Sequence, residues 1–184
     1  MISKNLKEAY QQIHANTPFG KRSKLPKFFE KFLNTLDVNS VLDFGCGKGN
    51  LVKTLKEIYP NKTIIGIDPA NPEFDNPLSK VDLILSTDVL EHIEPDFIDD
   101  TLKEIADNCK HTYHLISCAP AKLVLPDGRN AHLIQQSPEW WRKKFLDLGF
   151  KIHKEEYNEF EKYSKQLQKT LPVKNYFIMG SKNV

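Results

Sequence analysis

Residues 41–50 read Val-Leu-Asp-Phe-Gly-Cys-Gly-Lys-Gly-Asn, and this segment carries the strongest signal in the chain. A short apolar run stops at the first glycine, and a helical pattern with Leu51, Val52 and Leu55 on one face follows at once. Glycines at alternate positions let the backbone approach a ligand where a Cβ atom would collide, and the N–H groups that begin a helix face the same ligand. The segment therefore predicts a strand, a ligand-binding glycine turn and a helix.

Strands and helices continue to alternate after this segment. We expect strands at 63–67, 83–85, 113–117, 150–154 and 176–179, and helices at 96–109 and 137–148. The strands at 63–67 and 83–85 are continuous apolar runs, as is typical of strands covered on both faces. The pattern predicts a three-layer α/β/α Rossmann-like fold with a mostly parallel sheet over residues 39–184. Residues 1–38 are expected to form an N-terminal helical arm, with helices at 3–15 and 26–36.

Composition narrows the class of protein. A chain of 184 residues fits one domain, and 26 Lys and Arg against 24 Asp and Glu leave a formal charge of +2. This balance argues against strong attraction to nucleic acid or to anionic membranes. Three cysteines without CxxC spacing argue against a disulfide framework or a structural zinc site. Because no apolar stretch has the length of a membrane span and no hydrophobic signal core begins the chain, we expect a cytoplasmic location.

An acidic partner for the glycine turn narrows the choice of ligand. Asp68 ends the next predicted strand, 23 residues after Gly45, where a carboxylate can accept hydrogen bonds from both ribose hydroxyls of a nucleoside. The dinucleotide fingerprint G-x-G-x-x-G would require glycine where this chain has Asn50, and no phosphate-binding P-loop motif is present. Asp43 would place a negative charge close to a pyrophosphate. A ligand with a positively charged group is therefore favoured.

Residues 41–50, together with 65–68 and 82–93, resemble the class I methyltransferases that use S-adenosylmethionine. The first motif of that family reads as apolar residues followed by D-x-G-x-G-x-G. The resemblance implies that S-adenosylmethionine is the cofactor, that Asp43 lies by its methionine end, and that Asp68 holds its ribose. The cofactor-binding residues that it implies are Asp43, Gly45, Cys46, Gly47, Gly49, Asp68, Pro69, Asp88 and Val89.

One segment departs from the family pattern. Only the 13 residues 69–81 separate Asp68 from the next predicted strand, whereas a helix, a strand and a further helix usually fit there and need roughly 30 residues or more. We therefore expect the sheet to lack one edge strand. The adenine pocket would then be built from residues 69–71, with Asp75 as a further candidate.

Two histidines are candidates for the reaction itself. His92 follows Glu91 just beyond a predicted strand end, where it could act as a general base near neutral pH or could cap or pack the following helix. His132 ends a loop of about twenty residues, a length more typical of functional loops than of simple connections. His132 could therefore contact the substrate, act as a base or order its loop. No set of carboxylates and histidines has metal-ligand spacing along the sequence, so no metal is expected.

Several residues are candidates for recognition of the methyl acceptor. The N-terminal arm resembles the lids of similar methyltransferases, although it could equally pack as a structural helix with a solvated basic end. The long loop before residue 132 and the helix after it also carry polar and aromatic groups. The candidate substrate-binding residues are Tyr10, His14, Lys21, Arg129, Asn130 and Trp140.

The leading prediction is methyl transfer to an oxygen or nitrogen of a small molecule or glycan. The segment 86–89 reads Ser-Thr-Asp-Val rather than the [DNS]-P-P-[YF] loop with which many nucleic-acid methyltransferases hold a flipped base, which argues against a nucleic-acid acceptor. A catalytically silent module that only binds the cofactor or a partner is the alternative, since the short segment after Asp68 could weaken the adenine pocket. An NAD-dependent oxidoreductase is disfavoured by Asn50 and Asp43.

Overall fold

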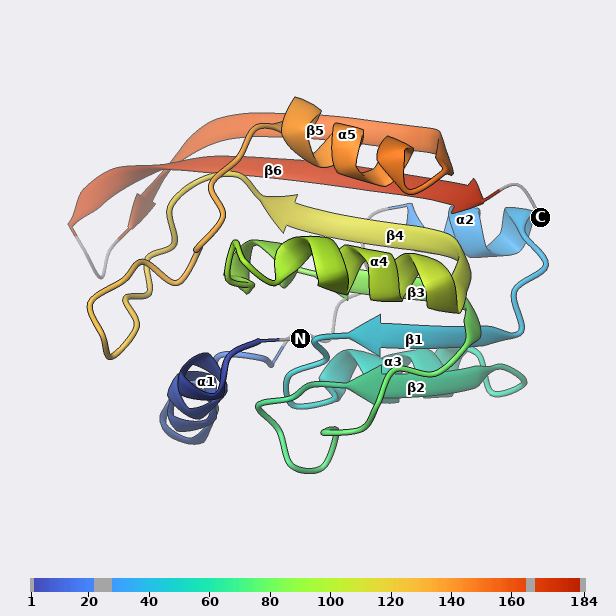
Figure 1. Cartoon of the computed structure of the whole chain (residues 1–184), viewed down its shortest axis with the longest axis horizontal. Coiled ribbons are helices and arrows are strands. Elements are labelled where there is room, and N and C mark those ends of the chain that lie inside the picture. The colour runs from blue at the N-terminus through green and yellow to red at the C-terminus, as the bar shows by residue number, and fades with distance from the viewer. Residues whose placement is uncertain (1, 22–27, 165–167, 183–184) are drawn as a thin grey trace.

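The computed structural model describes residues 2–21, 28–164 and 168–182, and within them one sheet lies between helices (Figure 1). The elements in chain order are α1 (Lys4–Asn16), α2 (Phe29–Thr35), β1 (Ser40–Phe44), α3 (Asn50–Ile58), β2 (Thr63–Ile67), β3 (Val81–Thr87), the 3₁₀ helix η1 (Leu90–His92), α4 (Ile98–Asn108), β4 (Cys109–Ser117), α5 (Pro138–Asp147), β5 (Phe150–Ser164) and β6 (Lys169–Lys182). None of the helices in these ranges combines the length and apolar character that crossing a membrane requires.

The sheet has the strand order β2-β1-β3-β4-β6-β5. β1 pairs in parallel with β2 and β3, and β3 pairs in parallel with β4, whereas β6 runs antiparallel to both β4 and β5. The four parallel strands therefore end at the same edge of the sheet, where ligands bind in open α/β folds. The predicted three-layer, mostly parallel architecture is confirmed.

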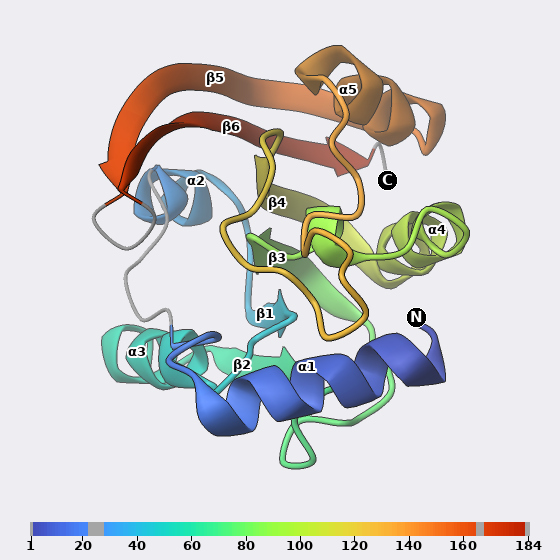
Figure 2. The same cartoon turned by 90° about the vertical axis from the view of Figure 1, so that its left-hand side faces the viewer.

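Each face of the sheet is covered by its own hydrophobic cluster. One cluster joins Leu42, Ile84 and Ile116 of the sheet to α4 and α5, and the other joins Val41, Leu83 and the facing side chains to α2 and α3. Figure 2 shows α4 and α5 on one side of the strands and α2 and α3 on the other. Neighbouring residues of β1 and β3 thus point to opposite faces and are buried on both, which explains the continuous apolar runs.

The connection after β2 is as short as the sequence indicates. Residues 69–80 form neither helix nor strand, so β2 is an edge of the described sheet. The segment folds back instead, because the Asp68 N–H donates to the Phe74 carbonyl over 2.9 Å. The Phe74 ring then lies against the glycine turn, where a Cβ atom on Gly49 would come within 2.4 Å of it. The predicted absence of one edge strand is confirmed.

The C-terminal hairpin is much longer than predicted. β5 and β6 pair from Phe150 with Lys182 to Ser164 with Lys169, with one register shift between Ile152 and Lys154. The sequence analysis placed only 150–154 and 176–179 in strands. The missed part of β5 is mostly charged and exposed, so it lacks the apolar run on which a sequence prediction depends.

The N-terminal arm divides into two parts with different surroundings. α1 crosses in front of the sheet edge at which the parallel strands end (Figure 2). Its N-terminal end is anchored, since the Ser3 hydroxyl donates to Glu94 Oε1 over 2.6 Å and Lys7 forms a 2.5 Å ion pair with Asp75. α2 packs instead into one of the core clusters, and the start of its predicted range at residue 26 lies outside the described residues.

Candidate active site

A cavity of about 240 Å³ lies at the carboxyl edge of the parallel strands. β1, β2 and β3 end at it, and α1 with the segment that follows α1 covers it. Eight of the nine cofactor-binding residues expected from the sequence line this cavity: Asp43, Gly45, Cys46, Gly47, Asp68, Pro69, Asp88 and Val89. The structure therefore brings together side chains from four separate segments at the place that the fold makes available for a ligand.

The glycine loop requires glycine for both its backbone and its packing. Gly45 and Gly47 have φ angles of 73° and 58°, in the left-handed region that other residues rarely adopt. A Cβ atom on Gly45 would lie 2.5 Å from a methyl carbon of Val89, and one on Gly47 would lie 2.6 Å from the carbonyl oxygen of Gly20. The N-terminal arm and the end of β3 thus approach the loop directly.

Three carboxylates give the cavity a negative character. Asp43 and Asp68 are buried, and Asp88 has a left-handed φ of 56° directly after β3. The N–H groups of Gly47 and Ala70 each donate to one oxygen of Asp68 over 2.8 Å. Burial raises the pKa of Asp68. The two hydrogen bonds favour the ionised form and so act in the opposite direction, but burial is the larger effect. The arrangement favours a ligand that carries a positive charge and donates hydrogen bonds.

Helix α1 contributes Tyr10 and His14 to the cavity wall, as the sequence analysis expected for substrate contact. The Nδ1 atom of His14 is buried and has no hydrogen-bond partner among the described residues. Burial lowers the pKa of His14, while the charge of Asp68 acts in the opposite direction. A buried polar atom without a partner is uncommon in folded proteins, and here it belongs to a side chain that lines the cavity.

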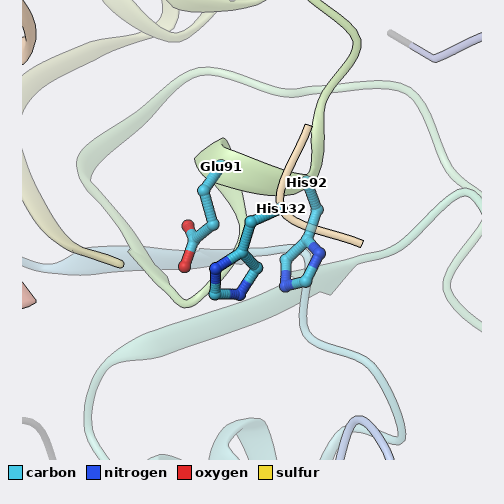
Figure 3. Close-up of side chains that lie close together, drawn as sticks. All are labelled: Glu91, His92 and His132. Carbon is cyan, nitrogen blue, oxygen red and sulfur yellow. The ribbon is translucent and has the colours of Figure 1, made fainter. Parts of the chain in front are cut away.

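The histidines His92 and His132 come together beside the cavity. His92 lines the cavity, and its ring centre lies 4.8 Å from that of His132 in an edge-to-face arrangement. Figure 3 shows the two rings side by side, with the Glu91 carboxylate next to His132. Glu91 is fully buried, and its Oε1 accepts the Ser117 N–H over 2.9 Å. These side chains come from η1 and from the long loop, which are separated by about 40 residues of sequence.

The hydrogen bonds of the two rings define their protonation. His92 Nδ1 lies 2.8 Å from the Ala131 carbonyl, and His132 Nδ1 lies 2.5 Å from the Ala119 carbonyl. Because a carbonyl oxygen only accepts, each Nδ1 carries the proton and each Nε2 keeps a lone pair. Burial lowers the pKa of His92 to about 4 and also lowers the pKa of His132. Both rings are therefore neutral at pH 7, with Nε2 available to accept a proton or a ligand.

The long loop between β4 and α5 is ordered by Asn130. Its Oδ1 accepts the N–H groups of Ala121 and His132 over 2.9 and 3.0 Å, and its Nδ2 donates to the Ala121 carbonyl over 2.9 Å. The side-chain amide is thus used inside the loop. The hydrogen bonds of Asn130 help to hold the loop in the form that places His132 beside His92. The expectation that Asn130 binds substrate stays a prediction.

Other expected residues lie away from the cavity. Gly49 packs against Phe74, and Lys21 is exposed, with its carbonyl oxygen accepting from Asn50. Arg129 is 45% exposed in its side chain and forms a 2.7 Å ion pair with Asp127. Trp140 lies on α5, with the ammonium group of Lys144 4.8 Å from its ring centre. None of these four residues is among those that line the cavity.

Sequence reasoning missed the importance of Glu91. Sequence spacing gave no metal-ligand set, whereas in the structure Glu91, His92 and His132 each offer a ligand atom within 4.8 Å of the others. The signal was partly present, because Glu91 and His92 follow directly after a buried strand. The third member could not be found without the fold of the loop. Phe19 and Gly20 belong to the N-terminal arm that the sequence analysis compared with a lid, and both line the cavity.

The three-layer fold and its carboxylate-lined glycine loop define a Rossmann-like α/β protein with a ligand site at the carboxyl edge. Residues 12–158 match the family model described as a methyltransferase domain, and the chain belongs to this family. The match covers the glycine loop, both histidines and the C-terminal end of α1 from Gln12 onward. No curated protein gives a sequence match.

Solved structures with the same fold include several methyltransferases. The 1,6-didemethyltoxoflavin-N1-methyltransferase of Burkholderia thailandensis, solved with 1,6-didemethyltoxoflavin and S-adenosylhomocysteine, is 12% identical with a TM-score of 0.63, over 97% of this chain and 88% of that chain. The magnesium protoporphyrin IX methyltransferase of Synechocystis, solved with S-adenosylmethionine, is 15% identical with a TM-score of 0.61, over 98% of this chain and 99% of that chain. A methyltransferase of Methanosarcina mazei is 15% identical with a TM-score of 0.61, over 88% and 99%. At sequence identities this low, these structural matches establish a shared fold and nothing more specific.

Proposed function

We propose that this protein transfers a methyl group from S-adenosylmethionine to an oxygen or nitrogen of a small polar molecule or glycan. The observation that carries the proposal is the cavity in which the glycine loop, Asp43 and Asp68 meet the neutral imidazole of His92. A cofactor site and a candidate acceptor site are thus contiguous. Membership of the methyltransferase domain family supports the reaction class.

The residues of the cavity fit this cofactor. Both oxygens of Asp68 are already held by N–H groups, so the carboxylate is oriented to accept further hydrogen bonds from ribose hydroxyls. Asp43 and Asp88 supply negative charge for a sulfonium and an ammonium group. Gly45 and Gly47 keep the loop free of side chains, and Pro69 and Ala70 line the wall on which the adenine would lie.

When bound, S-adenosylmethionine supplies an electrophilic methyl group on a sulfonium, so the protein has mainly to align an acceptor with it. His92 and His132 lie beside the cavity and each hold a lone pair on Nε2, so either ring can take a proton from an acceptor hydroxyl or amine. Tyr10 hydrogen-bonds His92 Nδ1 over 2.9 Å and thereby orients that ring. α1 forms one wall of the site, because its Tyr10 and His14 side chains line the cavity.

Calorimetric titration with S-adenosylmethionine, S-adenosylhomocysteine and NAD tests the cofactor assignment. We expect both sulfur ligands to bind and NAD not to bind. Asp68→Asn should weaken binding of S-adenosylhomocysteine by about tenfold or more, because a hydrogen bond to a charged group contributes about 1.5–3 kcal/mol. Asp147→Asn is the matched control, since Asp147 lies on the surface of α5, where its carboxylate pairs with Lys143.

Two outcomes would contradict the proposal. NAD binding without binding of either sulfur ligand would remove the cofactor assignment, and unchanged affinity in Asp68→Asn would show that the site is misplaced. Release of S-adenosylhomocysteine in the presence of small-molecule and glycan libraries then tests transfer. Tight binding with no transfer to any acceptor would favour the silent cofactor-binding module instead.

A further inference from the structure

Beyond the cofactor site, Glu91, His92 and His132 form a compact group of side chains that can ligate metals. We propose that these three residues bind one divalent transition-metal ion, for which Zn²⁺ is the appropriate probe. Two imidazoles and one carboxylate are a ligand set that suits Zn²⁺ and related first-row cations. The group borders the cavity, since His92 is one of the residues that line it.

The distances fit a site that closes around an ion. One ligand atom from each residue lies within 4.8 Å of the ligand atoms of the other two. Ligands about 2.1 Å from a tetrahedral metal lie about 3.4 Å apart, so small rotations of the side chains bring all three into contact with one ion. Figure 3 shows the His132 ring between the Glu91 carboxylate and the His92 ring, so that His132 neighbours both other side chains.

The hydrogen bonds behind the rings are those expected of histidine ligands. Metal-bound histidines commonly donate the other ring N–H to a backbone carbonyl or a carboxylate, which fixes the tautomer and the ring orientation. Here His92 Nδ1 is held by the Ala131 carbonyl and His132 Nδ1 by the Ala119 carbonyl. Two residues with no sequence proximity therefore both direct their Nε2 lone pairs away from the backbone. A packing role for either histidine would not require this shared arrangement.

Glu91 is placed by the backbone in a similar way. Its side chain is fully buried, its Oε1 accepts the Ser117 N–H, and its own carbonyl accepts the Ile134 N–H over 3.0 Å. These bonds connect η1 to the end of β4 and to the loop before α5. The negative charge acts in a region of low dielectric constant, where it attracts a cation more strongly than it would in water.

This site deepens the proposed function and rests on it for its role in the reaction. Three protein ligands leave a coordination position for the acceptor hydroxyl. The cation lowers the pKa of that hydroxyl, and its proton passes to water. The acceptor oxygen then forms the bond to the methyl carbon, while the carbon–sulfur bond breaks and its electron pair stays on sulfur. A hydroxylated acceptor is therefore favoured over an amine.

Zinc binding to the full chain, freed of metal with a chelator, is the direct test. We expect one Zn²⁺ per chain by elemental mass spectrometry and by calorimetry. His132→Ala and Glu91→Gln should each weaken zinc binding by about tenfold or more, since loss of even an outer hydrogen-bond partner commonly costs 10–100-fold. His153→Ala is the matched control, because His153 is exposed on β5 and lies away from the group. That variant should bind zinc like the unchanged protein.

Binding of S-adenosylhomocysteine is measured on the same samples and shows that each variant is folded. If the unchanged protein binds this ligand but not zinc, or if the two variants bind zinc as well as the control, the metal site is overturned and the histidines act as bases. If the unchanged protein does not bind S-adenosylhomocysteine, the proposed function is contradicted, whatever the zinc result. Once an acceptor has been identified, a chelator should abolish methyl transfer to it, and added Zn²⁺ should restore the transfer.

Discussion

Gly47 is the residue at which the N-terminal arm meets the glycine loop. Its N–H donates to Asp68, its φ is left-handed, and the Gly20 carbonyl lies where its Cβ would be. The neighbouring Lys48 N–H donates to that same carbonyl over 2.9 Å. One position therefore combines three demands, whereas the sequence analysis identified a different one, the close approach of the backbone to a ligand.

Gly47→Ala should lower both the stability of the protein and its affinity for S-adenosylhomocysteine. The substitution adds the cost of a left-handed conformation, about 1 kcal/mol, and pushes the segment at Gly20 away from the loop. Gly128→Ala is the matched control, because Gly128 also has a positive φ but no atom lies within 4 Å of its Cβ position. Urea unfolding and calorimetry should show similar backbone costs in the two variants and an affinity loss only in Gly47→Ala. Equal affinities would contradict the close packing of the arm on the loop.

Helix α1 links the cofactor cavity to the histidine pair. Its Tyr10 hydroxyl contacts His92 and donates to the Ala131 carbonyl over 3.2 Å, and its Tyr10 and His14 side chains line the cavity. The helix is capped by Ser3, whose hydroxyl accepts the Leu6 N–H over 3.2 Å and donates to Glu94. A single hydroxyl thus caps the N-terminus of the helix and also connects the helix to the segment before α4.

Ser3→Ala should loosen α1 and weaken ligand binding together. Loss of an N-cap costs about 1 kcal/mol, and the bond to Glu94 is lost with it. Ser137→Ala is the matched control. It removes the N-cap of a different helix, α5, where the Ser137 hydroxyl accepts the Trp140 N–H over 3.4 Å. Hydrogen exchange and calorimetry should show faster exchange in α1 and weaker binding of S-adenosylhomocysteine for Ser3→Ala alone. A similar loss of binding in Ser137→Ala would mean that the effect reports general stability.

Elements with an apolar face could be predicted from the sequence, and elements without one could not. β2 spans the predicted residues, and α3, α4 and α5 lie within a few residues of theirs, because each has an apolar run or face and end signals such as Ser137 and Gly149. The outer part of the β5–β6 hairpin was missed because its backbone pairing does not depend on buried side chains. The cofactor side of the site followed from glycines and acids at strand ends, which are local in sequence.

The whole molecule explains why the rest of the site could not be predicted. Glu91 and His92 are brought to His132 only because β3 and β4 are neighbours in the sheet and the loop after β4 folds back under the control of Asn130. The arm reaches the same place from the other end of the chain, through contacts such as Lys7 with Asp75. Such long-range contacts leave no periodic pattern in the sequence.

The shortened connection after β2 also has a consequence for the whole fold. With no further strand beside β2, Pro69 and Ala70 form the wall of the cavity at this edge, and Asn71 Nδ2 donates to the Gly47 carbonyl over 2.7 Å. The arm on one side and this segment on the other therefore enclose the glycine loop. The compact chain keeps the parts of the fold that surround the ligand and lacks an outer strand.

Electron density from a crystal of the full chain grown with S-adenosylhomocysteine is the most direct measurement of the central claim. The account predicts the nucleoside in the cavity under α1, with its ribose hydroxyls on the Asp68 carboxylate, its amino-acid end toward Asp43, and its sulfur on the side of His92. A ligand bound outside this cavity, or a cavity without ligand in protein that binds S-adenosylhomocysteine in solution, would contradict it.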